Sequence, residues 1–122
     1  MRPTLLIVDD HAGFRSLARR LLASGGFEVV GEAADGHAAV TAARRLRPDV
    51  VLVDVQLPDI DGFEVTARLV DGGSGPVVVL TSTRDRADYG DRVERCGARG
   101  FVPKAELSGT AVRALMGSDP MG

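Results

Sequence analysis

The sequence has little of several residue types: one cysteine, one tyrosine, one lysine and no tryptophan among 122 residues. The lone cysteine, Cys96, excludes an internal disulfide, and we expect it to be a small buried hydrophobe in a protein of the reducing cytoplasm. No apolar run approaches the roughly 20 residues of a membrane-spanning helix, and the N-terminal residues lack the plan of a signal peptide. These absences exclude a disulfide scaffold and a helical membrane span, and they predict a cytoplasmic location.

Charge of one sign does not dominate the chain either. The 15 basic and 17 acidic residues give a net charge of −2, which supplies no global attraction to nucleic acid or to an anionic membrane. A chain of this length with 44% hydrophobic residues builds one globular domain and has little room for a second. We therefore expect one domain over residues 1–117 and a flexible tail over residues 118–122.

Short apolar runs rich in valine alternate with helical patterns along the whole chain. These runs are typical of buried parallel strands, expected over residues 4–8, 27–33, 50–53, 77–80 and 100–102. Amphipathic helices are expected between them, from a cap at Asp10 to Gly25, from Asp35 or Gly36 to Leu46, over 63–70, over about 87–96 and over about 107–116. The fourth helix is intrinsically weak because it contains Gly90 and five charged residues. Five βα units joined by right-handed crossovers predict an α/β protein with helices on both faces of a parallel sheet.

The polar and charged residues best suited to catalysis or binding stand where apolar runs end. Asp9 and Asp10 follow the first run, Asp54 the third, Thr81 the fourth, and Lys104 follows the fifth. Open parallel sheets bind and react at the carboxyl ends of their strands, so these groups are expected to meet along one edge. Three clustered carboxylates repel one another, which makes a divalent cation their natural partner, and Mg²⁺ prefers oxygen ligands. The set is suited to a divalent metal and a phosphoryl group.

Taken singly, these residues also fit simpler interpretations. Asp10 is compatible with a plain helix cap, while Thr81 and Lys104 are compatible with an ordinary strand end and an exposed lysine. The simpler interpretation of Asp54 is a solvated aspartate, but that leaves unexplained why a polar residue ends so apolar a run.

Four segments, in order along the chain, carry a resemblance to a known family. They are Ile7-Val8-Asp9-Asp10, Val53-Asp54 with Leu57-Pro58-Asp59-Ile60-Asp61-Gly62, Val79-Leu80-Thr81, and Gly97-Ala98-Arg99-Gly100-Phe101-Val102-Pro103-Lys104. Together they resemble the bacterial two-component response-regulator receiver domain, and the resemblance covers essentially the whole chain. The closest similarity is to the receivers of regulators that carry a helix-turn-helix output domain. No output domain is expected in this chain.

The resemblance implies a flavodoxin-like (βα)5 fold with strand order 2-1-3-4-5 and a function as a phosphoacceptor. Asp54 would be the nucleophile that accepts a phosphoryl group from a histidine kinase and forms an aspartyl phosphate. Mg²⁺ would be held by Asp10, Asp54 and the backbone carbonyl of Gln56, with Asp9 acting through water or as an outer ligand. Thr81 and Lys104 would each bind a phosphoryl oxygen.

The resemblance also implies a conformational output and a set of partners. Thr81 and Phe101 would form the switch, acting on the surface made by the fourth helix, the fifth strand and the fifth helix. Because phenylalanine has no hydroxyl, the switch is predicted to work by packing. The expected partners are a sensor histidine kinase or phosphotransfer protein, a downstream protein or fused DNA-binding output domain, and a second copy through the same surface. No direct contact with nucleic acid or membrane is expected.

The chain departs from the family pattern after the lysine and leaves two rivals open. Pro103 precedes Lys104 and Ala105 follows it, so a trans bond is expected at Lys104-Ala105. We expect no turnover enzyme, only self-phosphorylation and autodephosphorylation at Asp54. One rival is a degenerate receiver that serves as an unphosphorylated binding module. The other is a phosphatase of similar fold with an aspartate nucleophile, although Gln56 stands where such enzymes usually place a second aspartate.

Overall fold

The computed structural model describes residues 2–71, 73 and 75–116, so the tail predicted over 118–122 lies outside the described residues. Five parallel strands form one sheet in the order β2-β1-β3-β4-β5, which confirms the predicted fold. The strands are β1 (Thr4–Val8), β2 (Glu28–Ala33), β3 (Val50–Asp54), β4 (Val77–Ser82) and β5 (Gly100–Pro103). The α-helices are α1 (Ala12–Ser24), α2 (Gly36–Leu46), α3 (Gly62–Val70), α4 (Arg92–Arg95) and α5 (Gly109–Leu115).

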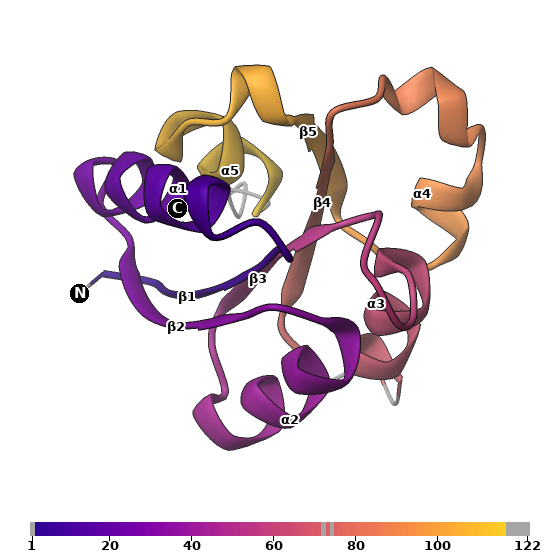
Figure 1. Ribbon diagram of the computed structural model, residues 1–122, viewed down its shortest axis with the longest axis horizontal. Coiled ribbons are helices and arrows are strands. Elements are labelled where there is room, and N and C mark those ends of the chain that lie inside the picture. The colour runs from indigo at the N-terminus through magenta and orange to yellow at the C-terminus, as the bar shows by residue number, and fades with distance from the viewer. Residues whose placement is uncertain (1, 72, 74, 117–122) are drawn as a thin grey trace.

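The helices cover both faces of the sheet, as Figure 1 shows. Successive residues of a strand point to opposite faces, so each central strand supplies two cores. In β1, Leu5 and Ile7 belong to the core beneath α1 and α5, whereas Leu6 and Val8 belong to the core beneath α2 and α3. Every residue of β3 is buried, which explains why its sequence is a continuous apolar run. No helix among the described residues is both long and apolar enough to cross a membrane.

The predicted cap of one helix is confirmed, and the predicted cap of another is wrong. Asp35 caps α2 as expected, since its side chain accepts from the backbone N–H of Ala38. The expectation that Asp10 caps α1 is wrong, because His11 occupies the N-cap position and makes no side-chain cap bond. The carboxylate of Asp9 accepts instead from the His11 N–H at 2.8 Å, and the side chain of Asp10 lies in the cluster of acidic residues at the sheet edge.

The segment expected as one helix over about 87–96 is broken in two. A 3-10 turn, η1 (Arg86–Tyr89), precedes the single turn of α4, and Gly90 between them has φ +60°. Glycine reaches that conformation without steric cost, so it interrupts the helix that the apolar spacing predicts. Cys96, which ends α4, is half-buried rather than fully buried, and its thiol donates to the carbonyl of Val93.

The last predicted helix also begins later than expected. A second 3-10 turn, η2 (Lys104–Glu106), follows β5, and Ser108 then caps α5 by accepting from the Ala111 N–H. The described residues contain no cis peptide bond, which confirms a trans bond after Lys104.

Candidate functional site

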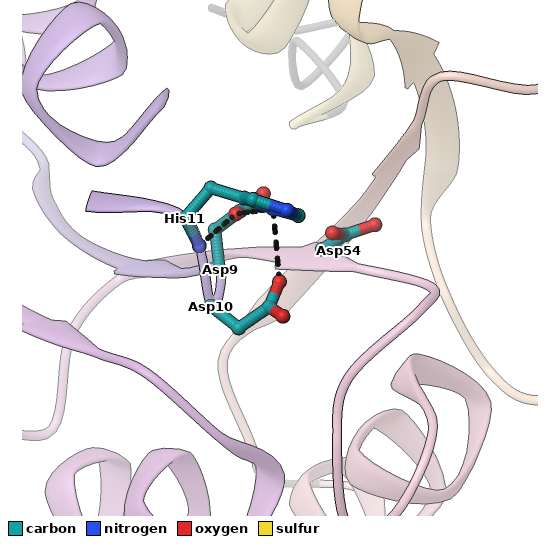
Figure 2. A group of neighbouring side chains, drawn as sticks. All are labelled: Asp9, Asp10, His11 and Asp54. Atoms are coloured by element: carbon teal, nitrogen blue, oxygen red, sulfur yellow. Dashed lines mark hydrogen bonds and ion pairs between the residues drawn. The ribbon is translucent and has the colours of Figure 1, made fainter. Parts of the chain in front are cut away.

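The predicted site residues meet at the carboxyl edge of the sheet. Asp9, Asp10 and His11 leave the end of β1, and Asp54 ends the neighbouring strand β3 (Figure 2). One side-chain ligand atom from each of these four residues lies within 4.8 Å of the others. The next strand is in register with this edge, because Thr81 of β4 lies beside Asp54. A cavity of about 250 Å³ opens here, lined by Asp10, His11, Asp54, Gln56, Leu57, Pro58, Thr83 and Lys104.

Lys104 bridges the two buried carboxylates of this edge. Its Nζ lies 2.6 Å from Oδ2 of Asp9, which is 0% exposed, and 3.3 Å from Oδ2 of Asp54. The other oxygen of Asp54, Oδ1, accepts from the Gln56 N–H at 3.2 Å. The ammonium also lies 4.3 Å from the centre of the Phe14 ring, a cation–π contact that helps to hold it in place. Lys104 is therefore a fixed charge between two acids.

Burial and crowding change the proton affinities at this edge. Burial raises the pKa of the Asp54 carboxyl to about 6, with a contribution from the charge of Asp9, although Lys104 and the Gln56 N–H oppose the shift. Burial lowers the pKa of Lys104, but its hydrogen bond to Asp9 and the charge of Asp54 outweigh burial and raise it. Lys104 thus stays charged while Asp54 is held in a costly ionised state at neutral pH. The single positive charge of Lys104 does not balance the charge of three carboxylates, and a divalent cation at this edge would offset the remaining negative charge.

The donor set is also right for such a cation. Asp10 and Asp54 offer carboxylate oxygens at the cavity, and the loop that follows β3 brings Gln56 to its wall. Oxygen donors of this kind suit the hard cation Mg²⁺, which keeps several of its waters and needs only one or two carboxylates.

Thr81 is part of the edge, but its hydroxyl points toward another strand. The side chain is fully buried, and Oγ1 donates to the carbonyl of Val102 in β5 at 2.6 Å. Phe101, the other predicted switch residue, is 9% exposed and packs in the core beneath α3 and α4. The hydroxyl of Thr81 is therefore bonded to β5 and not to Asp54, although Thr81 lies beside Asp54 in the sheet, and Phe101 is part of β5 itself.

The sequence analysis did not predict the contacts of two residues near the site. The ring nitrogen Nδ1 of His11 lies 3.2 Å from Asp9 and 3.0 Å from Asp10, although the side chain is largely exposed. The hydroxyl of Tyr89 shares a hydrogen bond of 2.7 Å with Ser82, and its ring centre lies 5.9 Å from that of Phe101. The position of His11 directly after the acidic pair Asp9-Asp10 was a sequence signal for its contacts. No local sequence pattern predicts the bond between Tyr89 and Ser82.

Comparison with known proteins agrees with this geometry. A family model described as "Response regulator receiver domain" matches residues 5–115. The chain belongs to this family of two-component signalling domains.

Relatives of known name place the same domain in different proteins. The chain is 36% identical over 112 residues to the response regulator GacA of Pseudomonas viridiflava, covering 91% of this chain and 52% of GacA. It is 44% identical over 108 residues to protein-glutamate methylesterase/protein-glutamine glutaminase 6 of Anaeromyxobacter dehalogenans, covering 88% of this chain and 31% of that protein. The chain thus spans about a third to a half of the length of these relatives.

Solved structures confirm the fold. A two-component response regulator of the LuxR family from Aurantimonas sp. SI85-9A1 superposes with a TM-score of 0.86 at 29% identity, covering 95% of this chain and 86% of that one. The response regulator domain of Thermotoga maritima CheB gives a TM-score of 0.82 at 29% identity, covering 98% and 100%.

Proposed function

We propose that this receiver domain accepts a phosphoryl group on Asp54 with the help of Mg²⁺ and signals through the surface formed by α4, β5 and α5. The observation that carries the proposal is the buried Asp54 carboxylate, 3.3 Å from the fixed ammonium of Lys104 and grouped with Asp9 and Asp10 at an open cavity. A carboxylate in that position has room for an incoming group and a counter-charge beside it.

The proposed reaction is a displacement at phosphorus. An oxygen of Asp54 attacks the phosphorus of a phosphohistidine in a kinase or phosphotransfer protein, and a P–O bond forms. The P–N bond breaks, and its electron pair stays on the imidazole nitrogen of the donor. A divalent cation held by Asp10, Asp54 and Gln56 would supply positive charge to offset the negative charge on the phosphoryl oxygens during transfer. Loss of the group to water returns the free carboxylate.

The surrounding residues have distinct parts in this proposal. Asp10, Asp54 and the carbonyl of Gln56 hold the cation, and Asp9 assists through water or as an outer ligand. Lys104 gives up part of its contact with Asp54 to pair with a phosphoryl oxygen.

The proposed signal begins at Thr81. Its hydroxyl leaves the carbonyl of Val102 and donates to a phosphoryl oxygen, and Phe101 repacks in response. The partners proposed are the kinase and a downstream protein or DNA-binding output domain in the cytoplasm, with a second copy as a further candidate. The GacA relative is named a response regulator, and EvgA of Escherichia coli, 30% identical over 110 residues, is named a DNA-binding transcriptional activator. These names support transcription control as the output. Nucleic acid and membrane are not proposed as direct ligands of this domain.

The proposal is tested by intact-mass spectrometry after incubation with Mg²⁺ and a small phosphodonor such as acetyl phosphate. One added phosphoryl group is expected, absent from Asp54→Ala and absent when Mg²⁺ is chelated. If no adduct forms and the phosphoryl mimic beryllofluoride also fails to bind, the proposal is wrong and an unphosphorylated binding module replaces it.

Emission from Tyr89 is expected to report the switch, because it is the one tyrosine in a chain without tryptophan. Its hydroxyl bonds to Ser82, the neighbour of Thr81, and its ring packs near Phe101, so movement of either changes its surroundings. Fluorescence is measured during titration with beryllofluoride and Mg²⁺. The change is expected in the wild-type protein and lost in Thr81→Ala. Unchanged emission in a protein that binds beryllofluoride would contradict the proposed switch.

A further inference from the structure

The N-terminus of α2 is capped by two aspartates from different parts of the chain. Asp35 is the helix's own cap and accepts from Ala38 N–H at 2.8 Å. Asp59 comes from the loop after β3, and its two oxygens accept from the N–H groups of Gly36 at 2.8 Å and His37 at 2.9 Å. Since the first N–H groups of a helix lack partners within it, a carboxylate there binds firmly. The second cap ties a distant loop to α2.

Asp59 and its neighbour Ile60 make further contacts with α2 beside the two backbone hydrogen bonds. Nδ1 of His37 lies 2.6 Å from Oδ2 of Asp59. Ile60 packs so closely on Gly36 that a Cβ there would lie 2.3 Å from its Cγ1. Partial burial raises the pKa of Asp59, but the N–H groups of His37, Gly36 and Ile60 outweigh it and hold the pKa well below its usual range. Asp59 is therefore charged at neutral pH, and its carboxylate accepts from the first N–H groups of α2.

The loop that Asp59 attaches is the wall of the site. It leaves β3 at Asp54, and Gln56, Leu57 and Pro58 line the cavity. Its two ends are closed by a bond from the Gly62 N–H to the Val55 carbonyl at 2.8 Å. Asp59 and Ile60 form the tip and face away from the cavity, toward α2. Asp59 is not a member of the cluster that holds the candidate metal ligands.

We propose that Asp59 is a positioning residue for the cation site, because it fixes the 55–62 loop on α2 and so sets where the carbonyl of Gln56 stands relative to Asp10 and Asp54. This inference rests on the proposed function, in which Gln56 is a metal ligand. Mg²⁺ requires near-octahedral geometry, so a ligand on a loop that moves is a poorer ligand. Releasing the tip of the loop weakens cation binding without removing a ligand.

The chain offers a matched control for this proposal. Asp59→Ala and Asp35→Ala each remove an acidic cap from the same end of α2, but only Asp59 belongs to the loop beside the site. Both variants are first compared with the wild type by urea unfolding, and titrations are run where each is folded. Mg²⁺ binding is followed by amide chemical shifts in NMR, and the initial rate of phosphorylation by acetyl phosphate is measured against Mg²⁺ concentration.

Asp59→Ala is expected to raise the Mg²⁺ dissociation constant about 10-fold, in the range known for groups that orient metal ligands. The rate at saturating Mg²⁺ is expected to stay within about twofold, because the ligands and nucleophile are intact. Asp35→Ala is expected to leave both quantities near the wild-type values. Asp59→Asn keeps one oxygen as an acceptor and is expected to fall between, and it carries the comparison if Asp59→Ala does not fold.

The possible failures are distinct. A wild-type protein that binds no Mg²⁺ overturns the proposed function together with this inference. A wild-type protein that binds Mg²⁺, with Asp59→Ala binding it equally well, overturns the inference alone. Equal weakening in Asp35→Ala also overturns it, because the effect would then belong to the capping of α2 and not to the loop.

Discussion

Replacing Asp54 with asparagine is expected to stabilise the folded protein at neutral pH, in the absence of Mg²⁺, by about 2–3 kcal/mol. The folded-state pKa of Asp54 is raised from 3.8 to about 6, mainly by burial, and each pKa unit corresponds to about 1.36 kcal/mol between protonation states. Asparagine keeps the shape of the carboxyl and removes the charge. The residue that the proposed function needs most is thus also one that costs stability.

The sign of this effect follows from proton linkage. Because the folded pKa of Asp54 exceeds the unfolded value, the folded state binds more protons between pH 3.8 and about 6. The contribution of Asp54 to stability is therefore full below pH 3.8 and is lost as the pH rises through about 6. The difference between Asp54→Asn and the wild type should grow over that window and then level off.

Urea unfolding of the wild type and Asp54→Asn, at several pH values with and without Mg²⁺, measures this difference. Mg²⁺ is expected to stabilise the wild type and to reduce the advantage of the variant, because the ion binds the folded site. A variant that is less stable than the wild type at pH 7 without Mg²⁺ would show that burial of Asp54 is not costly.

Replacing Lys104 with methionine is expected to destabilise the protein by about 3–5 kcal/mol at neutral pH. Methionine keeps most of the apolar stem, but the substitution leaves Asp9 and Asp54 without the ammonium that lies 2.6 Å and 3.3 Å from them. Removing one partner of a buried ion pair leaves an uncompensated charge, which is a large penalty. The loss should be smaller at pH 5, where Asp54 is mostly protonated.

Arg95→Met is the control for the loss of a cation. Arg95 pairs with Asp91 at 3.7 Å, and both side chains are more than 70% exposed, so this surface pair contributes at most about 0.5 kcal/mol. Equal losses in the two variants, or a loss in Lys104→Met that does not shrink at pH 5, would contradict the account of Lys104.

The sequence pattern predicted the sheet well because its signal is local. Each buried strand needs apolar residues on both faces, so the apolar runs that end at Val8 and Val53 predict β1 and β3 directly. The grouping of Asp9, Asp54 and Lys104 follows in turn, since the ends of parallel strands share one edge.

Some of the features that escaped prediction are local backbone effects, and others depend on contacts between segments distant in the sequence. Asp10 looked like a cap because it precedes α1, but the bond from His11 to Asp9 moved the helix start. The apolar spacing over 87–96 gave no reason to expect a break, which Gly90 imposes through its backbone. The contact of Phe14 with Lys104 and the cap that Asp59 gives α2 join residues brought together only by the fold.

The most direct test of the central claim is to locate the phosphoryl group. Protein treated with acetyl phosphate and Mg²⁺ is reduced with borohydride, which converts an aspartyl phosphate to homoserine, and the digest is then analysed by peptide mass spectrometry. Homoserine is expected at position 54, in the wild type alone and only when Mg²⁺ was present. Conversion at Asp9 or Asp10, or none in a sample whose intact mass shows the adduct, would contradict Asp54 as the phosphoacceptor.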